Sequence, residues 1–344
     1  MRTRLFAVLT LALLGPGVGL ADSTWRRVVV DLRHLELLNV VEKKYTHCLA
    51  PGGTGFAVFD GNVVRLLDAR DGKETQTLVG HDGKVHDSGW SRNGRLLVTS
   101  GFDTTVRVWE ASTGKLLMNV KPFGNFACSV AFAPDARSVA AGSSNDGQLK
   151  IYDVATGKAV REIQTTDSTL FAMEYSPDGR FLAVNHTPMN RADSSLRVYR
   201  AADGAEQKLP ITGPVGGFGF SRDGRLLAYA DLNGAVLILE TAGWTELRRL
   251  EGHQGGVSSL AFHPDGRYLV SSGHDGAAKI WDAETAGLVN TLTIKGQVDS
   301  RVAFGPDGAT LMVATSDATV KLFGRRETVS RAAPPAAPGP RPGK

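Results

Sequence analysis

Cysteine is scarce in this sequence, because only Cys48 and Cys128 occur among its 344 residues. Two thiols cannot build the disulfide framework of a small secreted domain, and no paired-cysteine spacing of a zinc site is present. The two cysteines lie in the first and third copies of a sequence repeat, with a whole copy between them. A disulfide needs Cα atoms about 6 Å apart. We therefore expect two small buried thiols.

Sequence motifs of catalytic sites are also missing. Neither a nucleophile elbow nor a phosphate-binding loop occurs, and the frequent Gly and Asp residues recur in tight-turn patterns. Basic residues exceed acidic ones only at the two ends of the chain. The formal net charge is +4, yet Arg2 and Arg4 contribute two charges and residues 325–344 hold five cations and one Glu, which leaves about −2 for residues 22–324. A basic face for nucleic acid is therefore excluded.

The first 21 residues have the pattern of a secretory signal peptide. Arg2 and Arg4 precede an apolar run from Leu5 to Leu14, which is too short to span a bilayer, and small residues end at Ala21. The alternative is an apolar N-terminal strand. No cysteine lies near the cleavage site, so a lipid anchor is not indicated. We expect a secreted or periplasmic protein without a membrane span after cleavage.

One stretch, from Gly252 to Asp282, has a second copy in the chain from Gly80 to Glu110. In each, a Gly-His pair is followed by three short apolar runs and two tight turns, which predicts three short strands. The interval from the His to the Trp is 28 residues in both copies.

Two landmarks indicate seven copies of this unit. The residue that ends the third run recurs at intervals of 40 to 47 residues, and a tight turn of the Pro-Asp-Gly kind repeats in step. The third-run residues are Leu67, Trp109, Tyr152, Tyr199, Leu239, Trp281 and Phe323. The fourth copy carries an inserted loop, from His186 to Ser195.

This period, with its Gly-His and Trp-Asp signatures, resembles the WD40 repeat family. The resemblance implies an all-β fold, a seven-bladed β-propeller of four-stranded antiparallel blades. It covers residues 22–324, after the signal peptide at 1–21 and before a Pro/Ala-rich tail at 325–344. The ring is expected to be monomeric and closed by an N-terminal strand, Trp25 to Leu32, that completes the last blade and removes an exposed edge.

The resemblance also implies a buried hydrogen-bonded tetrad of His, Ser or Thr, Asp and Trp in each well-kept blade. Two copies supply the set, with the hydroxyl residue open between Thr99 and Ser100 in one and Ser271 and Ser272 in the other. The predicted structural tetrads are His81, Ser100, Asp103 and Trp109, and His253, Ser272, Asp275 and Trp281.

Catalytic and metal sites have one candidate set, His86 and Asp87 with Glu174 and Asp299, on first strands that could face a central channel. The neighbouring channel positions are mostly Gly and Ala, which leaves too few ligands for a metal. We therefore expect solvated channel charges, no metal, no cofactor and no enzymatic activity. The alternative is a propeller enzyme or a small-ligand or metal binder that uses the channel.

With a signal peptide, no catalytic set and no basic face, the resemblance to the WD40 family, in which interaction platforms dominate, implies an exported scaffold that binds a protein or peptide. We expect the partner on the face carrying the Gly-His loops, called the top. Large side chains in loops of that face are candidate anchors, since aromatic and Arg residues often anchor interfaces. For Phe123 and Phe126 the alternative is that each fills a gap left by a missing tetrad His. The candidate partner-binding residues are Phe102, Phe123, Phe126, Arg191 and His274.

Overall fold

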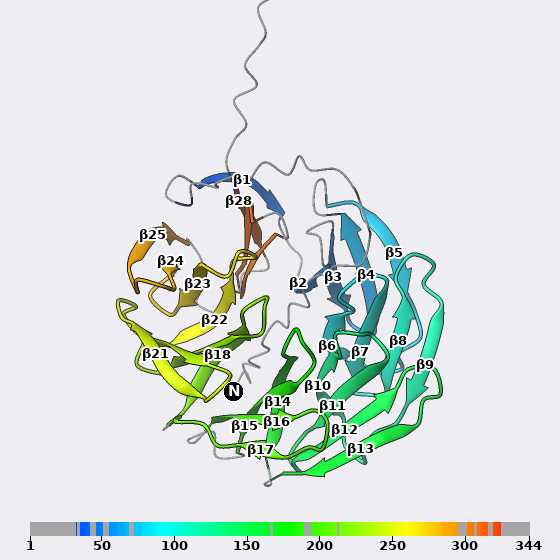
Figure 1. Ribbon diagram of the computed structural model, residues 1–344. Coiled ribbons are helices and arrows are strands. Elements are labelled where there is room, and N and C mark those ends of the chain that lie inside the picture. Colours follow the sequence, from blue (N-terminus) through cyan, green and yellow to red (C-terminus); the bar gives the residue numbers. More distant parts are fainter. Residues whose placement is uncertain are drawn as a thin grey trace, which may run out of the picture.

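Seven antiparallel sheets form a ring around a central axis in the computed structural model (Figure 1). The structure describes residue 32 and residues 35–41, 46–50, 55–68, 72–165, 168–188, 194–211, 213–294, 301–305, 308–315 and 319–324. The predicted signal peptide and tail lie outside this part. Every sheet has four strands, so the predicted seven-bladed β-propeller is confirmed. In the described residues, no helix is long and apolar enough to cross a membrane.

The seven sheets are blades, numbered in chain order from the one that begins with β2, and their strands are listed from the centre outward (Figure 1). Blades 1 to 3 contain β2 (Thr46–Leu49), β3 (Gly55–Asp60), β4 (Val63–Asp68), β5 (Glu74–Leu78); β6 (Val85–Trp90), β7 (Leu96–Gly101), β8 (Val106–Glu110), β9 (Leu116–Val120); and β10 (Ala127–Phe132), β11 (Ser138–Ser143), β12 (Gln148–Asp153), β13 (Ala159–Gln164).

Blades 4 to 7 follow the same order. They contain β14 (Thr169–Tyr175), β15 (Phe181–Thr187), β16 (Ser195–Arg200), β17 (Glu206–Gln207); β18 (Val215–Phe220), β19 (Leu226–Asp231), β20 (Val236–Glu240), β21 (Thr245–Leu250); β22 (Val257–Phe262), β23 (Tyr268–Gly273), β24 (Ala277–Asp282), β25 (Leu288–Thr293); and β26 (Arg301–Phe304), β27 (Thr310–Ala314), β28 (Val320–Gly324) and, as outer strand, β1 (Glu36–Val41).

The tight turn between the first two strands of a blade has the chemistry that its sequence predicts. In blade 4, Asp178 accepts a hydrogen bond from the backbone N–H of Arg180 at 3.0 Å. Between them, Gly179 has φ +74°, a left-handed conformation that Gly adopts without steric penalty. The same turn is described in blades 2 to 6, where it folds each first strand back onto the second.

An N-terminal strand closes the ring, but the predicted segment was wrong. β1 pairs antiparallel with β28, whereas Trp25 to Asp31 lies outside the described residues. Spacing explains the difference: β1 ends at Val41, five residues before β2 begins at Thr46, and every other outer strand ends five to eight residues before the next inner strand. The closing strand therefore takes the place that an outer strand has before every inner strand.

The core lies between neighbouring blades. One buried cluster joins Phe181, Leu196 and Val198 of blade 4 to Phe220 and Leu239 of blade 5, and similar clusters fill the other junctions. Both cysteines are buried and unpaired, as predicted.

Inner strands carry a register shift near their start. In blade 2 the pairing skips from Val85 to Asp87, and in blade 3 from Ala127 to Ser129. A β-bulge of this kind turns the skipped side chain, here His86 and Cys128, away from its regular position.

Candidate interaction surface

Two of the predicted anchor residues, Phe102 and Phe126, are brought together at the junction of blades 2 and 3. Phe102 lies in the turn between β7 and β8, and Phe126 directly precedes β10. Their ring centroids are 4.5 Å apart with an interplanar angle of 35°. Phe102 is 46% exposed, while Phe126 is half-buried. We call these two residues the aromatic pair.

His86 contacts both rings of the aromatic pair. Its ring centroid lies 5.5 Å from that of Phe102 and 5.4 Å from that of Phe126. The Nδ1 atom is 2.9 Å from the carbonyl oxygen of Cys128, and a carbonyl only accepts, so Nδ1 carries the proton. Burial lowers the pKa of His86, opposed by this hydrogen bond. A neutral, fixed imidazole therefore holds both phenyl rings in place.

Backbone hydrogen bonds fix the same two loops. The N–H of Phe102 donates to the carbonyl oxygen of Lys84 at 2.8 Å, and the N–H of Ser144 donates to that of Phe126 at 3.2 Å. Each partner lies in another loop of the same blade. The aromatic pair is therefore ordered before any partner binds, which reduces the entropy lost on binding.

Phe123 was wrongly predicted as a surface anchor. Its side chain is 7% exposed and packs in the core cluster that includes Met118, Ala127 and Tyr152. Lys150 places its Nζ atom 5.8 Å from the ring centroid. Phe123 stands where a tetrad His would stand, so it fills that space with apolar contacts instead.

His274, another predicted anchor, does not join the aromatic pair. His274 is exposed in the turn between β23 and β24, where its N–H donates to the carbonyl oxygen of Gly256 at 2.8 Å. That turn belongs to blade 6, which is not a neighbour of blade 2 in the ring. Arg191 lies outside the described residues, and His186, predicted to begin a loop, is buried within β15.

The tetrad of blade 2 is a directed chain of hydrogen bonds. Trp109 donates from Nε1 to Oγ1 of Thr99 at 2.8 Å, and that hydroxyl lies 2.7 Å from Nε2 of His81. Nδ1 of His81 lies 2.9 Å from Oδ2 of Asp103. Burial lowers the pKa of His81, opposed by Asp103, so the neutral ring accepts from Thr99 and donates to the carboxylate.

The hydroxyl residues predicted for the tetrads, Ser100 and Ser272, were wrong by one position. Thr99 supplies the hydroxyl in blade 2, and in blade 6 Ser271 Oγ accepts from Trp281 Nε1 at 2.7 Å and lies 2.8 Å from His253 Nε2. His253 Nδ1 lies 3.0 Å from Asp275. Successive side chains of a strand point to opposite faces, so only one of two adjacent hydroxyls can meet the Trp.

Blade 4 contains a different polar network, which the sequence interpretation missed. His186 lies between Tyr199, whose hydroxyl is 3.1 Å from Nε2, and Ser168, whose Oγ is 3.1 Å from Nδ1. Burial lowers the pKa of His186 to about 3. The available signal was Tyr199, which occupies the Trp position of the repeat while a His stands on the paired strand.

The candidate channel residues that the structure describes bind neighbouring backbone. Asp87 accepts a hydrogen bond from the N–H of Val130 at 3.0 Å, and burial raises its pKa to about 7, opposed by that N–H and by Arg301. Burial of the Glu174 carboxyl raises its pKa to about 8, opposed by the N–H of Phe220. Both acids thus connect adjacent blades.

Asp299, the fourth predicted member of the channel set, lies outside the described residues. Within the described ranges, no group of three or more His, Cys, Asp or Glu side chains is placed to hold a metal ion.

Three segments of the chain match the WD40 family model, described as WD domain, G-beta repeat. They are residues 72–110, 119–153 and 244–282, which end with the third strands of blades 2, 3 and 6. Those blades include both tetrads.

Parts of the chain are similar to other proteins, one of which is named for its WD repeats. An uncharacterized WD repeat-containing protein of Synechocystis, sll1491, is 30% identical over 134 residues, 38% of each chain. Autophagy-related protein 16 of Arabidopsis thaliana is 33% identical over 98 residues, 26% of this chain and 19% of that protein. Rat jouberin is 28% identical over 146 residues, which are 38% of this chain and 14% of that protein. These matches span well under half of each relative. The family model identifies the three segments as WD40 repeats, and the structure places them in a seven-bladed propeller.

Proposed function

We propose that this protein is an exported WD40-type scaffold without catalytic activity, and that its aromatic pair binds a protein or peptide partner on the top face. The observation that supports this proposal is the exposure of Phe102, 46%, on a base formed by Phe126 and His86. The relatives contribute the repeat type only.

The aromatic pair suits an interface anchor for two physical reasons. Exposed phenyl rings lose contact with water when a partner covers them, and aromatic residues are common among the side chains that dominate binding energy. The rings are also held by buried and backbone contacts, so little conformational entropy is lost on binding. An exposed Phe at this position contributes little to the stability of the free protein.

Export is the second part of the proposal, and it rests on Arg2, Arg4 and the apolar run from Leu5 to Leu14. The mature chain would begin after Ala21. Its N-terminus, sequenced from the exported fraction of the producing cell, should start at Asp22. Retention of the full-length chain inside the cell would contradict export and leave the binding proposal intact.

Affinity capture tests the binding function. Residues 22–344 serve as bait for the exported fraction, as wild type, as F102A/F126A, and as L116A/L117A. Leu116 and Leu117 are 39% and 41% exposed on β9 of the same blade, so they provide a matched control. We expect a protein that wild type and control retain and F102A/F126A loses. The same proteins on all three baits would contradict the assignment of the aromatic pair.

A further inference from the structure

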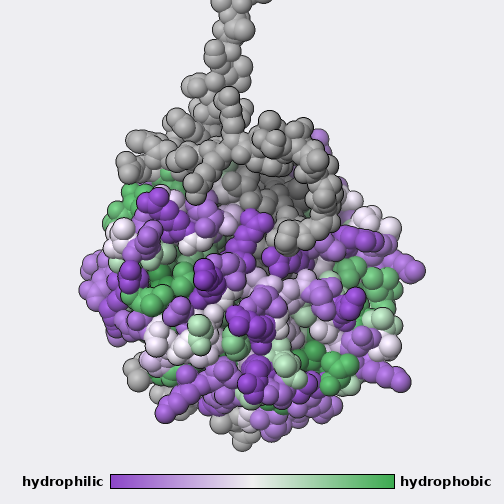
Figure 2. All heavy atoms as spheres, viewed as in Figure 1, coloured by the Kyte–Doolittle hydropathy of each residue, from purple (hydrophilic) through white to green (hydrophobic). Residues whose placement is uncertain are grey.

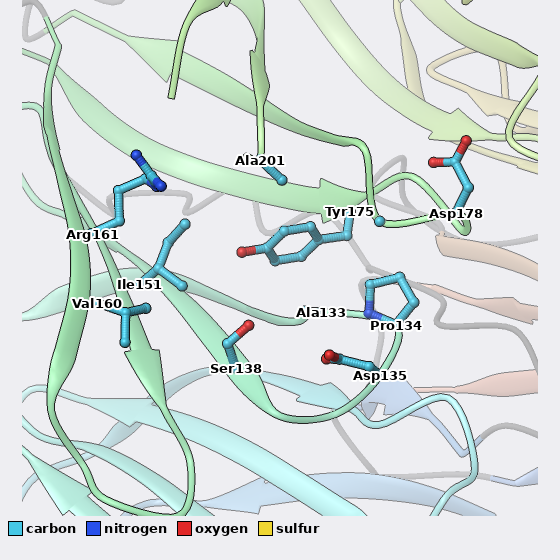
Figure 3. Close-up of a pocket in the computed structure, with 11 residues that line it drawn as sticks. Ala133, Pro134, Asp135, Ser138, Ile151, Val160, Arg161, Tyr175, Asp178 and Ala201 are labelled. Atoms are coloured by element: carbon cyan, nitrogen blue, oxygen red, sulfur yellow. The ribbon is translucent and has the colours of Figure 1, made fainter. Parts of the chain in front are cut away.

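Two grooves open between neighbouring blades, away from the aromatic pair. The first, about 440 Å³, lies between blades 3 and 4 and is lined by Ser138, Ile151, Val160, Arg161, Tyr175 and Asp178 among others (Figure 3). The second, about 370 Å³, lies between blades 5 and 6 and is lined by Leu226, Ile238, Leu247, Arg248, Asp265 and Ala283 among others. Turns between first and second strands, and between third and fourth strands, border both, so they open on the face opposite the top.

The two grooves are the same site of the repeat. Ile151 and Ile238 occupy the same position of the repeat, directly before the last core residue of the third strand. Val160 lies nine residues after Ile151, and Leu247 lies nine residues after Ile238. The adjacent arginines make the same contact: Arg161 Nη2 donates to the carbonyl oxygen of Ala202 at 2.6 Å, and Arg248 Nε donates to that of Glu284 at 2.9 Å.

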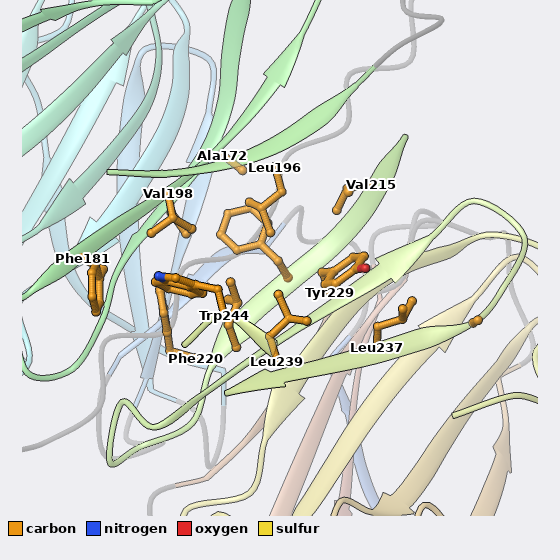
Figure 4. Packing of buried hydrophobic residues seen from close by; sticks show 14 residues of the cluster. Ala172, Phe181, Leu196, Val198, Val215, Phe220, Tyr229, Leu237, Leu239 and Trp244 are labelled. Carbon is orange, nitrogen blue, oxygen red and sulfur yellow. The ribbon is translucent and has the colours of Figure 1, made fainter. Parts of the chain in front are cut away.

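The equivalent space between blades 4 and 5 is filled by Trp244 (Figure 4). Its indole is 9% exposed and meets Phe181 in a T-shaped contact with ring centroids 5.0 Å apart. Phe181 stands at the repeat position of Ser138 and Leu226, and Val198 of the same cluster stands at that of Ile151 and Ile238. One junction of this protein therefore shows what fits the groove.

Trp244 reaches this space from an unusual backbone position. The turn between third and fourth strands has one residue of positive φ, and in four blades that residue is Gly. The series is Gly72, Gly114, Gly157, Gly204, Trp244 and Ala286. A Trp with φ +54° is sterically unfavourable, so burial of the indole must compensate. At the two open grooves the same position holds Gly204 and Ala286, which cannot fill the space.

We propose that each open groove receives a tryptophan side chain from a partner protein, in the position that Trp244 occupies between blades 4 and 5. The walls include apolar groups left uncovered, since Val160 is 59% and Leu247 40% exposed. On the face viewed in Figure 2, apolar side chains form separate small areas on a largely polar surface. Each groove has only a few exposed apolar groups, so it suits a single inserted side chain better than a broad apolar contact.

Charge at the groove between blades 3 and 4 favours indole over phenyl. Asp135 lines this groove together with the Tyr175 ring (Figure 3), whereas the Asp178 carboxylate accepts hydrogen bonds from Ser176 and Arg180. An indole N–H donates and never accepts, so carboxylate oxygens suit it. A phenyl ring has no such donor. The inference goes beyond the proposed function, because it concerns another face and does not require the aromatic pair.

Isoleucine methyl resonances of the full chain test the proposal. Ile151 and Ile238 line the two grooves, and Ile280 is fully buried elsewhere in blade 6. Titration with N-acetyl-tryptophanamide should shift the first two signals and leave the third unchanged. N-acetyl-phenylalaninamide should act more weakly, and N-acetyl-leucinamide should produce no saturable shift. Absence of any response at Ile151 and Ile238, or an equal response to leucinamide, would overturn the proposal.

An engineered internal tryptophan provides the specificity control. Ala286 has φ +61°, close to that of Trp244, so Ala286→Trp should fill the groove between blades 5 and 6 from within. The response of Ile238 to N-acetyl-tryptophanamide should then disappear while that of Ile151 persists. A separate variant, Trp244→Ala, should open the filled junction, so the same compound should raise its melting temperature more than that of wild type. An unchanged Ile238 response in a folded A286W protein would contradict the equivalence of the sites.

Discussion

Asn290 donates a hydrogen bond from Nδ2 to the backbone oxygen of Leu32 at 3.0 Å, across 258 residues of sequence. Its repeat position is that of Arg161 and Arg248, which donate to the turn between third and fourth strands of the next blade. Leu32 thus takes the place of that turn in blade 7, and its buried side chain joins the core between blades 6 and 7. The segment before β1 therefore contributes to closure of the ring in addition to β1 itself.

Truncations test this closure. Removal of residues 22–41 takes away Leu32 and β1, so it should expose the edge of β28 and lower the melting temperature strongly. Removal of residues 22–33 should have an intermediate effect, because the Leu32 contacts are lost while β1 remains. Removal of residues 325–344, the Pro-rich tail, is the control and should change the melting temperature least. Equal melting temperatures for the three truncations would contradict closure by β1.

The tetrads predict a contrast between adjacent hydroxyls. Thr99→Val removes the group that bonds both Trp109 and His81, which leaves buried polar atoms without partners and should lower the free energy of unfolding by roughly 2–4 kcal/mol. Ser100→Ala should lower it by less than about 1 kcal/mol, because the buried Ser100 hydroxyl has no hydrogen-bond partner. Chemical denaturation of both variants measures the difference. A larger loss for Ser100→Ala would show that the hydroxyl was assigned wrongly.

Asp87 should make stability depend on pH. Burial raises its pKa in the folded chain to about 7, above the unfolded value, so the folded state binds more protons between those values. Its contribution to stability is therefore present at acidic pH and is lost as pH rises through that range. Asp87→Asn lacks this loss, and its stability relative to wild type should grow by roughly 1.4 kcal/mol per pH unit between about pH 4.5 and 6.5. A difference that stays constant with pH would contradict the desolvated carboxyl.

Metal removal gives a further expectation. The described acids Asp87 and Glu174 each accept from a backbone N–H of the next blade, so we expect that folding needs no metal. Treatment with a chelator should leave the melting temperature unchanged. A drop reversed by calcium or magnesium would indicate a bound ion that stabilises the native state, and would implicate Asp87, Glu174 and Asp299.

The repeat was predictable from sequence because its turns are local. Asp178 and Gly179 specify their turn through contacts within a few residues, and seven such turns give the number of blades. The closing strand depends instead on a pairing between β1 and β28 at opposite ends of the chain, and composition favoured the wrong segment. Spacing to the next inner strand was the better guide.

The site was predicted less completely, since it depends on side-chain direction. Phe102 and Phe123 look alike in sequence, but one lies in an exposed turn and the other in a core. The contact between Phe102 and Phe126 joins two blades, and the bulge that places His86 beneath them leaves no sequence pattern of its own. Trp244 likewise occupies a turn position where the repeat favours Gly.

Site-specific photo-crosslinking in the producing cell tests the central claim, that the aromatic pair contacts a protein partner, most directly. A photoreactive phenylalanine replaces Phe102, and a matched variant carries it at Leu288, which is 52% exposed on the outer strand of blade 6. Since Phe102 is an exposed turn residue, replacement should change the free energy of unfolding by less than about 1 kcal/mol. We predict a discrete crosslinked protein from position 102 and none from position 288. Crosslinks from position 288 alone, or from neither position, would contradict the account.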